Sequence, residues 1–244
     1  MKNTFKIIAI AAMTVLGASC SKINSDDKNT PINATVTFRL LEGGKYYMKV
    51  DEANALIPTN KNLQEYPFTP AKEKRALISG FLNNQEVDAV PGMMSTQSVV
   101  VTKMDTIRIK QPVKYDKAKD SEYGHDPIGL YLSDSNTFPF TMTEDGYLNL
   151  CFAINLAASL EGNVAHDINL LTGINPSDPY EVEVRHNANG DIQNGKKTSF
   201  IVCFPLNSLP DTEGKVVNLK LKWNSLATGK TETVEIPYIS RKDW

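Results

Sequence analysis

The sequence predicts an all-β protein in which a small OB-like barrel precedes an antiparallel β-sandwich. Short segments of alternating apolar and polar residues recur along the chain, and Gly, Asn, Asp or Pro punctuates the intervals between them. A helical period is nowhere sustained over several turns. A charged stretch near the middle divides the strand-like segments into two groups, which indicates two domains.

Residues 1–19 have the organisation of a lipoprotein signal peptide. Two early lysines supply positive charge, and residues 7–16 form an apolar run of about 10 residues, too short to span a bilayer. Small residues at 17–19 precede Cys20, as at the cleavage site of a bacterial lipoprotein. We expect Cys20 to carry more than one acyl chain, which suffices for stable anchoring. An ordinary secreted protein with a chance cysteine is the alternative.

Residues 20–32 are expected to form a flexible acidic tether, because they are polar and show no hydrophobic period. The Ser25-Asp26-Asp27 cluster behind Cys20 resembles the surface-export signal of Bacteroidota lipoproteins. This resemblance favours an outer-membrane lipoprotein that faces the cell surface, with the periplasmic leaflet as the second choice.

Residues 33–113 are expected to form the OB-like barrel. The pattern predicts a hairpin, a continuation of its second strand, a third strand and two closing strands, at 35–41, 45–50, 55–58, 75–82, 99–104 and 106–113. A Gly-Gly pair supplies the hairpin turn.

Residues 114–124 are highly charged and are interpreted as a linker. Residues 125–244 are expected to form the sandwich, because strand candidates recur there between turn residues. The candidate strands are 126–132, 138–142, 147–156, 166–171, 180–186, 199–206, 216–223 and 231–238.

Composition argues against nucleic acid as a partner. The chain carries 26 Lys and Arg against 28 Asp and Glu, and no basic cluster is longer than residues 72–75. Neutralising phosphates requires clustered cations. No second apolar run approaches the length of a membrane-spanning helix.

Cys151 and Cys203 each lie on a predicted strand, on the face opposite its apolar row. Export would permit a disulfide between them if the two strands are neighbours. Two unpaired thiols are the favoured alternative, because the sequence does not show the close approach that a disulfide requires.

We expect no enzyme activity and no metal or cofactor. The chain contains no Gly-x-Ser-x-Gly, His-Glu-x-x-His or phosphate-binding Gly-rich motif. His125 directly follows the predicted linker. His166 and His186 are assigned structural roles rather than metal ligation, since a third ligand is not evident.

A polar stretch after the last of these histidines has two interpretations. Oxygen-bearing side chains recur at every second position, as in a calcium loop: Asn187, Asn189, Asp191 and Gln193. The Asn-Gly dipeptides in the same stretch instead favour a long β-hairpin loop. Arg185 is expected to bond this loop to the body of the sandwich.

The barrel offers a second candidate surface, because OB-type barrels often bind oligonucleotides or oligosaccharides on one face. Tyr46 and Tyr47 are consecutive, so only one of them can point outward, and core packing is favoured for the aromatic residues. The candidate residues are Arg39, Tyr46, Tyr47, Lys49, Arg75 and Arg108.

Four runs in the second half resemble the NigD-like lipoprotein family. They are Asp126-Pro127-Ile128, Tyr147-Leu148-Asn149, His166 with Ile168-Asn169-Leu170, and Arg185-His186-Asn187-Ala188-x-Gly190-Asp191. The resemblance covers nearly all of the mature chain and implies an N-terminal OB-type domain with a C-terminal β-sandwich. The family takes its name from a bacteriocin operon, so the resemblance also implies an immunity role.

We therefore expect a lipid-anchored cell-envelope protein with a non-catalytic binding role of the bacteriocin-immunity type. An accessory surface glycan-binding lipoprotein is the alternative. The expected partners are the membrane, through Cys20, and an unidentified protein, peptide or glycan.

Overall fold

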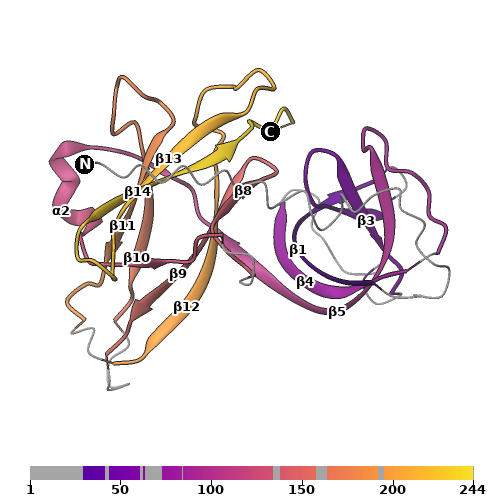
Figure 1. The fold of residues 1–244 in the computed structure, drawn as a ribbon, viewed down its shortest axis with the longest axis horizontal. Helices are drawn as coiled ribbons and strands as arrows, with labels where there is room; N and C mark the ends of the chain where they lie inside the picture. Colours follow the sequence, from indigo (N-terminus) through magenta and orange to yellow (C-terminus); the bar gives the residue numbers. More distant parts are fainter. Residues whose placement is uncertain are drawn as a thin grey trace, which may run out of the picture. The chain divides into compact units, whose positions relative to one another are not determined.

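The computed structural model describes residues 30–41, 44–60, 63, 73–83, 85–133, 138–157, 164–191 and 195–243 (Figure 1). The expected signal peptide, Cys20 and most of the expected tether lie outside these residues. The chain divides into two compact units between Ile109 and Lys110. In the described part, no helix is long and apolar enough to cross a membrane.

The first unit is a closed five-stranded barrel, as predicted. Its strands pair in the order β3-β2-β1-β4-β5, and a parallel pairing of β3 with β5 closes the ring. The strands are β1 (Thr30–Leu40), β2 (Tyr46–Lys49), β3 (Asn54–Pro58), β4 (Lys74–Asn83) and β5 (Ser95–Ile109). Figure 1 shows the curvature of β1, β4 and β5 around the barrel.

Alternation along β1 builds the barrel core. Ile32, Val36 and Phe38 on one face are all at most 6% exposed, and side chains of β2, β3, β4 and β5 meet them. Because the strand begins at Thr30, the last residues of the expected tether are part of the barrel: Ile32 pairs with Gly80 of β4.

The two closing strands expected at 99–104 and 106–113 are one strand, and that prediction was wrong. Asp105 lies between them in sequence but continues the ladder opposite Leu77. The irregularity is one extra residue in β5 itself: Ser79 pairs with Lys103 and Gly80 with Val101, so Thr102 has no partner in the ladder. A Cβ at Gly80 would lie 2.2 Å from the Val100 carbonyl oxygen, so glycine is needed for this close approach.

The second unit is a β-sandwich, as predicted, although it is not antiparallel throughout, because β11 pairs in parallel with β13. In one sheet β9 pairs with β12, β7 and β8, and the other has the order β14-β13-β11-β10-β6. Its strands are β6 (Val113–Lys114), β7 (Gly129–Leu130), β8 (Met142–Glu144), β9 (Tyr147–Asn155), β10 (Asp167–Thr172), β11 (Glu181–Asn187), β12 (Lys197–Pro205), β13 (Val217–Asn224) and β14 (Thr231–Tyr238).

Apolar residues from both sheets fill the sandwich core. Strand alternation points Leu148 and Leu150 of β9 toward Val184 of β11 and Leu221 of β13, all at most 1% exposed. The strand expected at 138–142 is nearly absent, since only its last residue enters β8.

The segment expected as a linker, residues 114–124, has regular structure in the second unit. β6 pairs in parallel with β10, and the Tyr115 amide donates to the Thr172 carbonyl at 2.9 Å. The helix η1 (Lys117–Lys119) and the single turn α2 (Asp120–Tyr123) follow. Their exposed charged residues give this segment the composition of a linker. Tyr123 is nevertheless buried, so the segment packs against the second unit.

Cys151 and Cys203 lie on adjacent strands, β9 and β12, and both are free thiols. They are offset in the ladder: Cys151 opposes Ile201, and Cys203 opposes Asn149, whose side-chain oxygen accepts from the Cys203 thiol at 3.0 Å. Burial, with a smaller effect of Cys203, raises the pKa of Cys151 to about 12. Cys151 is therefore a neutral thiol at physiological pH.

Candidate functional site

The candidate site is the end of β11 together with the turn that follows it, the Arg-His-Asn-Ala motif of the sequence. Alternation along the strand gives adjacent residues opposite faces. Val184 and His186 point inward and are each 1% exposed, while Glu183, Arg185 and Asn187 lie on the outer face. Consecutive motif residues therefore make different contacts.

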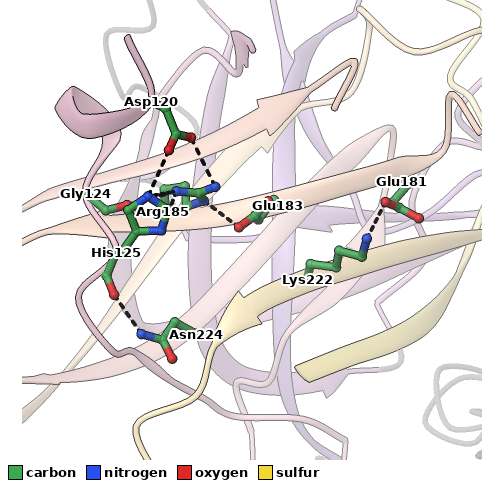
Figure 2. A network of polar contacts seen from close by, with 8 residues as sticks. All are labelled: Asp120, Gly124, His125, Glu181, Glu183, Arg185, Lys222 and Asn224. Carbon is green, nitrogen blue, oxygen red and sulfur yellow. Dashed lines mark hydrogen bonds and ion pairs between the residues drawn. The ribbon is translucent and has the colours of Figure 1, made fainter. Parts of the chain in front are cut away.

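On the outer face, Arg185 binds the segment that leads into the sandwich (Figure 2). Its Nη1 atom donates to the Gly124 carbonyl at 3.3 Å and lies 2.7 Å from the His125 ring nitrogens. Its Nη2 atom lies 3.4 Å from Asp120 Oδ1, and its Nε atom donates to Glu183. The arginine thus holds residues 120–125 against β11.

Asp120 has a lowered pKa, because His125 hydrogen-bonds its carboxylate and the charge of Arg185 adds to the effect. A carboxylate with a lowered folded-state pKa contributes stability above its unfolded pKa, about 3.9, and loses it as the pH falls further. The Asp120 contact is therefore present at neutral pH.

Ion pairs continue along the same face of β11 and β13. Lys222 Nζ binds Glu181 at 2.5 Å (Figure 2), and Lys220 Nζ binds Asp178 at 2.6 Å. Each lysine lowers the pKa of its carboxylate partner through the hydrogen bond. Each of these four charged side chains therefore has a partner of opposite charge.

On the inner face, His186 is part of a hydrogen-bonded chain. Its Nδ1 atom lies 3.1 Å from the Pro127 carbonyl oxygen, and its Nε2 atom lies 2.8 Å from His166 Nδ1. His166 Nε2 in turn lies 2.8 Å from Asp191 Oδ2. The side chains of His166 and Asp191 are each 7% exposed. Burial lowers the pKa of His186.

The turn after β11 is held mainly by its own side chains. Asn187 Oδ1 accepts from the Asn189 amide at 2.8 Å, and Asn187 Nδ2 donates to the Glu122 carbonyl at 3.0 Å. Asn189 and Gly190 have φ values of 49° and 82°, the backbone that the Asn-Gly dipeptide predicts. These φ values fit a tight turn, but the prediction of a β-hairpin was wrong, because β11 and β12, which flank this stretch, belong to different sheets.

The geometry does not gather metal ligands. The calcium-loop candidates diverge: Asn187 binds backbone, Asn189 Nδ2 donates to the Ala165 carbonyl, and Asp191 binds His166. Gln193 lies outside the described residues. The two histidines direct nitrogens at each other instead of at a common point. In the described part, no group of three or more His, Cys, Asp or Glu residues could hold a metal ion.

The barrel candidates do not converge on one exposed face. Tyr46 is 6% exposed and packs edge-on against Phe38, whereas Tyr47 is half-buried. Arg75 is fully buried and donates to Thr37. The others are distributed differently: Lys49 is buried beside Glu52, Arg39 pairs with Glu73, and Arg108 is exposed.

Two sequence runs that are about 60 residues apart interlock, which the sequence did not predict. The Asp126 amide donates to the His186 carbonyl at 2.9 Å, and the Ala188 amide donates to Asp126 Oδ2 at 2.7 Å. Arg185, expected to bond the hairpin loop, binds residues 120–125 instead. The polar residues of both runs thus fasten backbone segments together.

Comparisons with known proteins agree with these observations. Residues 111–238 match the family model of the NigD-like C-terminal beta sandwich domain. No curated protein matches the chain. A crystal structure of a candidate toxin-related protein from Parabacteroides distasonis is 30% identical, with a TM-score of 0.64, and the match covers 86% of this chain and 94% of that one.

Two more distant structures share the fold. A NigD-like immunity protein from Bacteroides caccae is 16% identical, with a TM-score of 0.57, and the match covers 85% of this chain and 97% of that one. A candidate lipoprotein from Bacteroides fragilis is 11% identical, with a TM-score of 0.55, and the match covers 87% of this chain and 100% of that one.

Proposed function

The chain belongs to the NigD-like family, and from this premise we propose that it is a lipid-anchored envelope protein with a non-catalytic, immunity-type binding role. The solved immunity protein of Bacteroides caccae supports the role by its shared fold. The candidate lipoprotein of Bacteroides fragilis supports the anchor in the same way. The anchor itself would be Cys20, which follows the leader in the sequence.

The proposal rests on the contacts that the polar motif at residues 185–188 makes. Arg185 and Asn187 bind backbone carbonyls of Gly124 and Glu122, and His186 faces the carbonyl of Pro127. General acid-base or nucleophilic chemistry needs such groups directed at a substrate. Here they hold the sandwich together, so the motif supports a scaffold that presents a binding surface.

The glycan-binding alternative has weaker support. It requires exposed aromatic rings that share one face, on which sugars can stack. Of the two barrel tyrosines that the sequence singled out, Tyr46 is buried and Tyr47 is half-buried. The described part of the barrel therefore offers no paired platform built from these residues.

The role can be tested by a survival assay in a Bacteroidales strain that lacks the gene. Cells expressing the wild-type chain, Cys20→Ala or Lys222→Ala are challenged with bacteriocin-containing culture supernatants from related strains. We expect the wild-type chain and the surface variant Lys222→Ala to protect, and Cys20→Ala to fail because the protein leaves the membrane.

Mass spectrometry and protease accessibility establish anchoring and exposure in the same cells. If the acylated wild-type chain protects against none of the supernatants that kill vector-only cells, the immunity role is wrong. If Cys20→Ala protects as well as the wild type, the anchor is not required.

A further inference from the structure

A buried chain of titratable groups crosses one end of the sandwich. It runs from Asp191 through His166 and His186 to the carbonyl of Pro127, with contacts of 2.8, 2.8 and 3.1 Å. The proposed function uses none of its proton chemistry. The three contacts connect backbone segments that are far apart in the sequence.

The geometry sets the number of hydrogens in the chain. A carbonyl can only accept, so His186 Nδ1 carries a hydrogen and donates to Pro127. The contact between the two rings needs one hydrogen, and the contact between His166 Nε2 and Asp191 needs another. Two neutral imidazoles supply only two hydrogens for three contacts. A third proton must therefore be present.

The surroundings favour an ion pair as the place of this third proton. Asp191 Oδ2 also accepts from the Ala157 amide at 2.9 Å, which suits an ionised carboxylate. His186 is the more buried of the two rings, and burial disfavours its charged form. The arrangement that satisfies all contacts is an imidazolium at His166, a carboxylate at Asp191 and a neutral His186.

We propose that Asp191, His166 and His186 form a proton-dependent latch at this end of the sandwich. The latch is closed while the chain holds three protons. Loss of the third proton leaves two unshared electron pairs facing each other, so one contact opens. Either the contact between His166 and Asp191 breaks, which frees the turn that binds Ala157, or the contact between His186 and the Pro127 carbonyl breaks.

Charged neighbours on the adjoining elements favour the closed state. Asp126 lies on the segment against His186 and accepts from the Ala188 amide. Asp167 begins β10 beside His166 and accepts from Asn189 Nδ2 at 3.3 Å. Both side chains bring a carboxylate group to the neighbourhood of the two rings. A positive imidazolium is therefore the favoured partner for them.

The pH dependence of stability tests the latch, and Asp191→Asn is the matched variant. Its amide nitrogen can donate to His166 Nε2, so the three contacts of the chain are satisfied with both rings neutral. A nitrogen at that position no longer accepts from the Ala157 amide, so the variant is less stable at every pH and only the slopes of the two profiles are compared. The folded wild type then holds one proton more than the folded variant. Stability falls with rising pH wherever the folded state binds more protons than the unfolded state.

We expect the two stability profiles to differ in slope above the imidazole pKa of the unfolded chain, about 6.5. The wild type should lose stability as the pH rises, whereas Asp191→Asn should reach a plateau. Their unfolding equilibrium constants should diverge by about tenfold per pH unit, the slope for one proton. Urea unfolding of the full chain measures this, with Cys20→Ala in every sample to prevent acylation. Parallel profiles would overturn the latch.

Nitrogen-15 NMR of the histidine rings in the wild-type sequence is a second readout that does not depend on the variant folding. At neutral pH we expect both His166 nitrogens to be protonated, and His186 to be protonated at Nδ1 alone. Two singly protonated rings would overturn the latch.

Discussion

Arg185 and His186 show how adjacent residues of one motif hold different parts of the sandwich. Strand alternation sends the arginine to the outer face, where it binds residues 120–125, and the histidine inward, where it binds Pro127 and His166. Both residues hold segments from distant parts of the chain. A substitution at either position should therefore affect folding before any partner is involved.

Arg185→Ala should lower the free energy of unfolding by about 1 to 3 kcal/mol, because it leaves Asp120, Glu183 and the Gly124 carbonyl without this donor. Lys222→Ala is the matched control on the same face, where a more accessible ion pair should contribute less than about 1 kcal/mol. Urea unfolding at neutral pH measures both. Equal losses of unfolding free energy would show that the contacts of Arg185 with residues 120–125 stabilise the fold no more than an accessible ion pair does.

At the scale of elements, the segment from Asp120 to Ile128 packs against β11 and is not a flexible linker. Its close approach to β11 is possible because Gly124 lacks a side chain. Gly124 has a φ of +74°, and a Cβ there would lie 2.4 Å from the His186 carbonyl oxygen. Both the backbone conformation and the space require glycine.

Gly124→Ala should destabilise the sandwich by about 2 to 4 kcal/mol, since strained backbone and overpacking add together. Gly190→Ala separates the two effects: its φ is +82°, but nothing lies within 4 Å of the added Cβ. That control should lose only about 1 kcal/mol. Thermal unfolding of the two variants measures the difference, and similar losses would mean that the segment moves away from β11 easily.

The sequence predicted most strands because alternation and turn residues are local signals. The strands β9 and β12 and the Asn-Gly turn at Asn189 are examples. It missed β6 and α2, since their exposed charges resemble a linker. It also missed the contact of His166 with Asp191, because 25 residues separate them and no spacing rule brings them together.

For the whole molecule, the division into two units at Ile109 predicts which fragments fold. A fragment of residues 110–244 retains β6, α2 and every partner of Arg185 and His186 described above. A fragment that begins at residue 125 loses Asp120, Gly124 and β6, which pairs with β10.

We expect the longer fragment to unfold cooperatively and the shorter one to be unstable or unfolded. Circular dichroism during urea titration distinguishes the two. Equal cooperativity and midpoints would show that residues 110–124 add nothing to the sandwich, contrary to their hydrogen bonds with Thr172 and Arg185.

Anchoring at Cys20 is the premise on which the proposed envelope function rests, and mass spectrometry of the mature N-terminus tests it most directly. The protein is isolated from its native membrane, and its N-terminal peptide is compared with that of Cys20→Ala. We expect the wild-type peptide to begin at Cys20 and to carry the mass of its acyl chains. A wild-type peptide without acyl chains, or one that still contains the leader, would contradict a lipid-anchored function.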